Sequence, residues 1–217
     1  MNELAEDRRA NPTDDLTSKL VHNDVGEDML DPSEIAPFFI LLAVAGNDTT
    51  RTAISHGMNL LALNPDQRRA WQDDLDAVSP TAVEEIVRVA SPVTYMRRTA
   101  TRDISLSGQD FVEGDKLVML YGSANRDERV FADPERFDVR RDPNPHLGFG
   151  GPGPHFCLGA HLARREVSVA FRQLLTRLPD IEVDSPPVPL QGMGMPLVGG
   201  IKSLPVSFTP SDPLGSH

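Results

Sequence analysis

The most constraining feature of the sequence is a glycine-rich loop that holds its only cysteine. Residues 149–159 contain four glycines and two prolines around Cys157, and a helical pattern begins directly afterwards. Glycines lack a Cβ, so the backbone here can come close to a flat or bulky group. A cysteine at a helix start lies at the positive end of the helix dipole, which favours the thiolate form. A single thiolate suits a soft metal or nucleophilic chemistry, and not a disulfide.

Composition narrows the class of protein. A chain of 217 residues allows one compact domain or two small ones, and a hydrophobic content of 39% is enough for a core. The net charge of −11 argues against nucleic acid as a partner and against anionic membrane surfaces. The longest uncharged apolar run, residues 35–47, is shorter than the ~20 residues of a membrane span. With one cysteine and no signal segment after Met1, we expect a cytoplasmic protein with no membrane span.

A long central helix is the strongest local prediction. Residues 31–34 combine a capping residue, a first-turn proline and a capping-box glutamate, and the helical pattern then continues to Pro65. That length is about thirty residues, or ~48 Å at 1.5 Å per residue. Residues 35–45 are apolar nearly all round, which predicts burial. The polar residues 45–50 interrupt this pattern, and alone they are best interpreted as a bend with satisfied side chains.

The remaining elements are shorter. Further helices are predicted at residues 65–76, from a Ser79-Pro80 cap to about Val89, and at 158–178. Strands are predicted at residues 94–99, 104–106, 116–123, 181–183 and 204–208. Glu85 and Arg88 lie three residues apart on one helix face, where an exposed pair is worth only a few tenths of a kcal/mol. The expected fold class is mainly α with small β-sheets.

The Cys157 loop resembles the haem-ligand loop of the cytochrome P-450 monooxygenases. It has an aromatic residue at Phe149, glycines, a basic residue two before the cysteine at His155, and a glycine two after it. Phe149 is eight residues before Cys157, whereas the usual spacing is seven, and this longer form resembles a bacterial subset acting on steroids and methyl-branched lipids. The resemblance implies the C-terminal, haem-ligand-bearing half of that fold over residues 1–208, followed by a loose tail at 209–217.

The resemblance also implies a site. Cys157 would be the axial ligand of the iron of haem b. The expected haem-binding residues are Phe149, Gly153, Gly159, Arg98 and His155. Arg98 and His155 match positions that bind the haem propionates, although a solvated strand position beside Arg97 is the alternative for Arg98.

Two further sets of residues match the family. Asp48 and Thr49 match the acid and threonine that flank the site of dioxygen cleavage, and a helix opened at residues 45–46 would leave room for dioxygen and a water. Glu85 and Arg88, with Arg136 downstream, match a buried network that supports the cysteine loop and does no chemistry.

The partners follow from charge and resemblance together. Residues 136–177 carry seven arginines, no lysine and three acids, a balance of 7 − 3 = +4. An ordinary charged helix face and a docking surface for an acidic partner explain this equally well. The resemblance favours a ferredoxin-type electron donor, with its reductase, near the Cys157 face.

The implied activity is insertion of one oxygen atom from O2 into a C–H bond of an apolar small molecule. The sequence around Asp48 and residues 123–127 resembles the lipid-oxidising subset, so we expect terminal hydroxylation of a steroid or methyl-branched lipid. The chain has about half the family's usual length. Two alternatives therefore stay open: a non-catalytic fragment that needs an N-terminal half, and a haem-binding or electron-transfer module.

Overall fold

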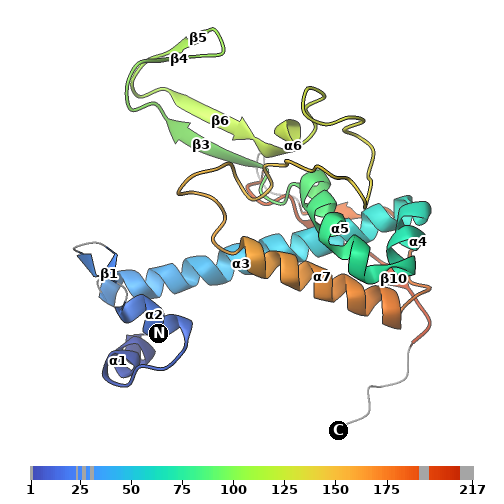
Figure 1. Ribbon diagram of the computed structural model, residues 1–217, viewed down its shortest axis with the longest axis horizontal. Coiled ribbons are helices and arrows are strands. Elements are labelled where there is room, and N and C mark those ends of the chain that lie inside the picture. The colour runs from blue at the N-terminus through green and yellow to red at the C-terminus, as the bar shows by residue number, and fades with distance from the viewer. Residues whose placement is uncertain (1, 23, 26–27, 30–31, 191–195, 211–217) are drawn as a thin grey trace. The chain divides into compact units, whose positions relative to one another are not determined.

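The computed structural model describes residues 2–22, 24–25, 28–29, 32–190 and 196–210 (Figure 1). The protein is mostly helical with small sheets, as predicted. It divides into two compact units, Met1–Asn47 and Asp48–His217. The expectation of one partial domain over residues 1–208 remains a prediction, and the expected tail lies outside the described residues from 211 onward.

The helices are α1 (Asn2–Ala10), α2 (Leu16–His22), α3 (Pro32–Leu63), α4 (Pro65–Asp73), α5 (Leu75–Ala90), α6 (Tyr121–Ala124) and α7 (Ala160–Arg177). The strands are β1 (Asp24–Val25), β2 (Asp28–Met29), β3 (Tyr95–Thr99), β4 (Ile104–Leu106), β5 (Gln109–Phe111), β6 (Lys116–Leu120), β7 (Glu182–Val183), β8 (Val188–Pro189), β9 (Ile201–Ser203) and β10 (Val206–Ser207). They form the antiparallel pairs β1–β2, β3–β6, β4–β5, β7–β10 and β8–β9. Figure 1 shows the β4–β5 hairpin at the outer end of the β3–β6 ribbon.

Helix α3 has the predicted length but not the predicted burial. Ile35 is fully buried against Ala5 and Val21 of the first unit. Farther along, however, Ile40, Leu41 and Val44 are 65%, 61% and 58% exposed. An all-round apolar pattern predicts burial only if other elements cover every face. The helix is also unbroken through residues 45–50, so the expected opening at residues 45–46 is not an interruption of the helix.

The core of the second unit forms where α3, α4, α5 and α7 meet. The rings of Trp71 and Phe171 lie 5.0 Å apart, and Trp71 satisfies its indole N–H by donating to Ser79 Oγ at 2.9 Å. Gly57 allows α3 to come close, because a Cβ there would lie 2.6 Å from Phe171 Cζ and 2.8 Å from Ile86 Cδ1. This packing positions α5 and α7, which carry the residues around the cysteine loop.

Helix α5 begins earlier than the Ser79-Pro80 cap predicts. Asp74 caps it instead, accepting the Ala77 backbone N–H at 3.0 Å. Ser79 lies inside the helix and donates its hydroxyl to the Leu75 carbonyl. Pro80 is the sixth residue of α5, where it removes one intrahelical hydrogen bond without ending the helix, and Asp74 provides the cap.

Candidate functional site

Cys157 lies at the end of the loop that leads into α7. Its side chain is exposed and forms no disulfide. The Cys157 backbone N–H donates to the Phe149 carbonyl at 2.9 Å, and the Cys157 carbonyl accepts from Ala160 N–H, at the first residue of α7, at 3.2 Å. These two bonds close the loop and connect it to the helix.

The loop backbone depends on its glycines. Gly150 and Gly153 have φ angles of +87° and +133°, which side chains rarely tolerate. Gly148 packs so tightly that a Cβ would lie 2.5 Å from Val87 Cγ1 on α5. In contrast, a Cβ on Gly153 or Gly159 would meet nothing within 4 Å. The loop is therefore packed against α5 at Gly148, and the space beside Gly153 and Gly159 is open.

Phe149 is held firmly despite the extra residue in the loop. Its side chain is buried among Val87, Ala160 and Ala163. The guanidinium carbon of Arg164 lies 4.4 Å from the centroid of the Phe149 ring. Since the Phe149 carbonyl also accepts the Cys157 N–H, the position of this ring and the position of the cysteine are linked.

Glu85 and Arg88 form a buried ion pair on α5. Both side chains are fully buried, and Arg88 Nε and Nη2 each lie 2.8 Å from a Glu85 oxygen. Glu85 also accepts from the Asp138 backbone N–H at 2.9 Å and from Asn144 Nδ2 at 3.0 Å. The second arginine at this carboxylate is Arg141, whose Nε lies 3.2 Å away.

The prediction of Arg136 as that arginine is wrong. The Arg136 side chain is 62% exposed and lies 3.9 Å from Asp138. Arg136 takes part through its backbone carbonyl, which accepts from Arg88 at 3.1 Å and from Arg141 at 3.0 Å. A sequence motif identifies the segment, but the path of the backbone decides which of its arginines faces inward.

Asn125, which the sequence did not single out, connects the ion pair to the loop. Arg88 Nη1 donates to the Asn125 backbone carbonyl at 2.8 Å, and the Asn125 side-chain oxygen accepts the Leu147 N–H at 2.7 Å. Asn125 is completely buried, and its amide nitrogen donates to Ser91 Oγ at 2.9 Å. The sequence signal was indirect: Asn125 lies in the segment 123–127 that resembles the lipid-oxidising subset.

The two expected propionate ligands lie on separate exposed segments. Arg98 is on β3, paired with Leu117 of β6, and donates to the Arg97 carbonyl at 3.1 Å. His155 lies in the cysteine loop. Both residues are exposed, and their joint role in binding the propionates stays a prediction.

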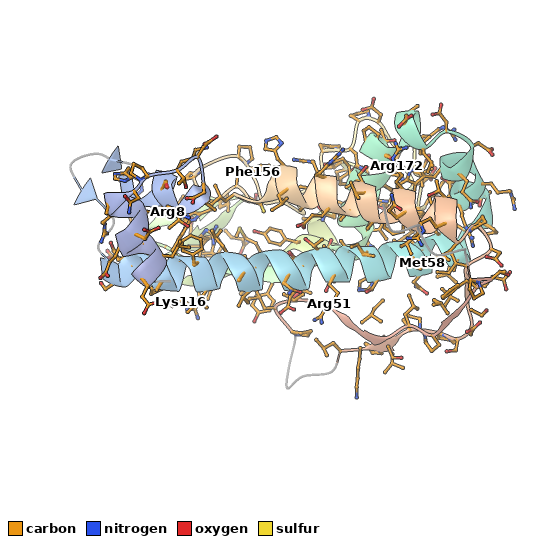
Figure 2. The ribbon with its side chains drawn as sticks, turned by 90° about the horizontal axis from the view of Figure 1, so that it is seen from below. Arg8, Arg51, Met58, Lys116, Phe156 and Arg172 are labelled. Carbon is orange, nitrogen blue, oxygen red and sulfur yellow. The ribbon has the colours of Figure 1, made fainter. Side chains whose placement is uncertain are left out.

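Asp48 and Thr49 lie on α3, beside the residues that contact α7. Arg51 Nη2 lies 3.0 Å from Asp48 Oδ1, and both side chains are largely exposed. The next residue, Thr50, donates to Glu166 of α7 at 3.1 Å. Figure 2 shows α7 alongside α3, with Phe156 just before α7 and Arg51 on α3. The structure thus brings the segment that carries Asp48 and Thr49 to the flank of α7.

A family model decides the identity of this arrangement. The model described as cytochrome P-450 matches residues 2–195. The chain belongs to the cytochrome P-450 family. Among curated relatives, a methyl-branched lipid omega-hydroxylase of Mycobacterium tuberculosis is 57% identical over 206 residues, covering 95% of this chain and 47% of the relative. A steroid C26-monooxygenase of Rhodococcus jostii is 44% identical, covering 95% of this chain and 42% of that protein. The chain therefore spans about half the length of these relatives.

Solved structures agree with the family. A Mycobacterium marinum cytochrome P-450 in complex with pseudoionone is 50% identical with a TM-score of 0.87, covering 95% of this chain and 49% of its own. A cytochrome P-450 in complex with an acyl carrier protein ligated to hexadec-9Z-enoic acid is 36% identical with a TM-score of 0.86, covering 96% and 52%. Within the described ranges, no helix is long and apolar enough to cross a membrane.

The cytochrome P-450 family implies a haem cofactor, and the residues around Cys157 fit one. A cysteine thiolate is the iron ligand in this family. Beside Cys157, the side chains of Phe156, Leu158 and Leu162 are 44%, 75% and 62% exposed, an unusual concentration of uncovered apolar surface. Together with the open space at Gly153 and Gly159, this surface suits a flat apolar group that carries its own metal.

Proposed function

We propose that this chain is the haem-binding part of a monooxygenase that hydroxylates an apolar lipid. The reaction would convert R–H, O2, two electrons and two protons to R–OH and water. The observation that carries the proposal is the exposed Cys157 at the start of α7, in a loop closed by the Cys157–Phe149 backbone bond. The name of the 57% identical relative supports terminal hydroxylation of a methyl-branched lipid, and the steroid relatives support a steroid as the second candidate.

The loop residues would hold the cofactor, haem b. Cys157 would bind its iron through the thiolate, Gly153 and Gly159 would leave room for the ring, and Phe149 would pack beside it. Arg98 and His155 neutralise the propionates, since charged donors bind carboxylates strongly. When bound, haem supplies the activation of dioxygen and the oxidation of the C–H bond. The protein's own task is to hold the ligand, exclude water and control protons.

Asp48 and Thr49 would deliver those protons. The Asp48 carboxylate is exposed and pairs with Arg51, so it can exchange protons with solvent. The Thr49 hydroxyl, on the next residue of α3, can accept a proton from such a donor and pass one on. Arg51 contacts only the Oδ1 atom of this carboxylate, so delivery would use Oδ2 or follow release of Arg51.

The electrons would come from a ferredoxin-type donor with its reductase. The arginine excess of residues 136–177 supports an acidic partner at the Cys157 face. Several of these arginines are committed to internal pairs, notably Arg141 and Arg164. The docking surface would therefore depend on the more exposed ones, Arg136 and Arg165 among them.

The test is the carbon-monoxide difference spectrum of the reduced, purified chain after haem supplementation. We expect a thiolate-type Soret band that is absent from Cys157→Ala. Product analysis with a methyl-branched fatty acid, O2 and a ferredoxin system would then show a terminal alcohol. A chain that takes up no haem, or that shows the same band without Cys157, contradicts the proposal.

A second candidate is a haem-binding part that acts only together with a further polypeptide. The exposed apolar side chains of Ile40, Leu41, Leu158 and Leu162 favour it, because such surface is normally covered. An electron-transfer module is disfavoured, since a carrier has no need of the Asp48–Thr49 pair. Recovery of product only after adding the N-terminal half of a relative would select the second candidate.

A further inference from the structure

Two adjacent carboxylates on α5 enter separate networks. Glu85 pairs with Arg88 and Arg141, as described above. Glu84 instead contacts one residue before the cysteine loop and one residue after it. His146, before the loop, has its Nε2 2.9 Å from Glu84 Oε2. Arg164, on α7 after the loop, has its Nε 2.5 Å from Glu84 Oε1 and its Nη2 3.0 Å from Oε2. A single carboxylate thus joins residues on both sides of Cys157.

The His146 arm fixes the first turn of the loop. The imidazole is 3% exposed, and its Nδ1 accepts the Gly148 backbone N–H at 3.0 Å. Because Nδ1 is an acceptor, the proton of the neutral ring is assigned to Nε2, which donates it to Glu84. Gly148 is pressed against Val87 on the same helix. The start of the loop is therefore held to α5 at His146, which contacts Glu84, and at Gly148, which packs against Val87.

The Arg164 arm acts on the cysteine through Phe149. Glu84 orients the Arg164 guanidinium over the Phe149 ring, and the Phe149 carbonyl accepts the Cys157 N–H. The hydrogen bonds that Arg164 donates to Glu84 are the main cause of a raised pKa at Arg164, and the nearby Cys157 also raises it. Burial raises the pKa of Glu84, but the hydrogen bonds of His146 and Arg164 outweigh it and lower the pKa to about 2. Glu84 and Arg164 thus stay charged and paired near neutral pH.

We propose that Glu84, His146 and Arg164 form a positioning clamp that holds the Cys157 loop in its ligand-binding geometry. The clamp acts on Cys157 through Phe149 and Gly148 and touches no reacting atom. Its effect on the loop is independent of the proposed function, and only its effect on metal ligation rests on that function.

The chain contains a matched control for the clamp. Asp76 of α5 and Arg172 of α7 form a second ion pair between the same two helices. Its side chains are 87% and 42% exposed, and both lie far along the helices from the loop. Asp76→Asn therefore removes an α5–α7 ion pair without removing a contact to residues 146–157.

Amide hydrogen exchange of the full chain without added haem tests the clamp directly. In Glu84→Gln we expect at least a tenfold faster exchange of the Gly150 and Cys157 amides, with exchange in the centre of α7 unchanged. Asp76→Asn should leave both loop amides at the rates of the unaltered protein. Equal loop rates in the two variants, whether both raised or both unchanged, would overturn the proposal. If Glu84→Gln does not fold, Arg164→Lys replaces it, because lysine keeps the charge but not the two-pronged contact.

The haem-loaded chain provides a readout that a purely structural role would not move. In Glu84→Gln at full haem occupancy, we expect a smaller fraction of the haem to give the thiolate-type band in the reduced carbon-monoxide spectrum. Asp76→Asn should show no such loss. The same fraction in both variants would refute control of metal ligation by the clamp. If even the unaltered chain takes up no haem, the proposed function fails, while the exchange rates still decide whether the clamp holds the loop.

Discussion

The buried pair on α5 provides the sharpest test of the structural interpretation. Glu85→Gln keeps the size of the side chain and removes its charge. Arg88 would then remain fully buried, with its positive charge uncompensated by a carboxylate. Arg141, Asn144 and the Asp138 backbone would also lose their ionised acceptor.

The expected cost follows from that burial. Removing one partner of a buried, hydrogen-bonded ion pair destabilises a protein by about 3–5 kcal/mol, because the other charge is left in a low-dielectric environment. That is a large part of the ~5–15 kcal/mol that separates folded from unfolded states in a typical domain. At ~2–4 °C per kcal/mol for a chain of this size, the midpoint of thermal unfolding should fall by roughly 6–20 °C.

The measurement is urea and thermal unfolding of the full chain, followed by circular dichroism. The matched control is Arg51→Gln, because Arg51 and Asp48 have the same three-residue spacing on a helix but lie in solvent. We expect no measurable change in its unfolding midpoint. A loss below about 1 kcal/mol in Glu85→Gln would show that Arg88 is not buried as described. A loss equal to that of Arg51→Gln would refute the distinction by burial.

Three further outcomes follow. Gly57→Ala should destabilise the fold by about 1–3 kcal/mol in urea unfolding, because its Cβ would overlap Phe171 and Ile86; an unchanged midpoint would disprove the close approach of α3. Because the pKa of Glu84 is about 2, below its ordinary 4.5, its stabilisation is complete above pH 4.5 and lost as the pH falls toward 2. The thermal midpoint should accordingly fall less steeply over that range in Glu84→Gln, and parallel curves would contradict this. In a haem-loaded chain, Thr49→Ala should lower the product formed per electron pair, and an unchanged yield would remove Thr49 from proton delivery.

Most of the local structure could be predicted because its causes are local. The long helix follows from a cap, a proline and an uninterrupted pattern, and α3 ends at Leu63, two residues before the predicted stop at Pro65. Strands β3, β4, β6, β7 and β10 lie within the predicted ranges, whereas β1, β2, β5, β8 and β9 were not predicted. Residues 121–123, predicted as the end of a strand, belong to α6. The start of α5 was missed because Asp74 and Ser79 are both good caps, and the preceding helix had been extended over the first of them.

In the candidate site, too, the sequence predicts some residues, whereas others depend on the fold. Cys157 and its glycines could be identified from the chain because their chemistry does not depend on a partner. The Glu85–Arg88 pair could be proposed because residues three apart share a helix face. The choice between Arg136 and Arg141 could not, since both follow the same motif and only the fold decides which one faces Glu85.

The amino-acid sequence by itself determined the family, the ligand loop and the order of the helices. These properties depend on residue type and on spacings of a few residues. The tertiary structure alone decided that Asn125 connects Arg88 to the loop, that Arg141 completes the buried network, and that Glu84 joins His146 to Arg164. Each of these contacts joins residues distant in the chain, so each depends on how α5, α7 and the loop pack together.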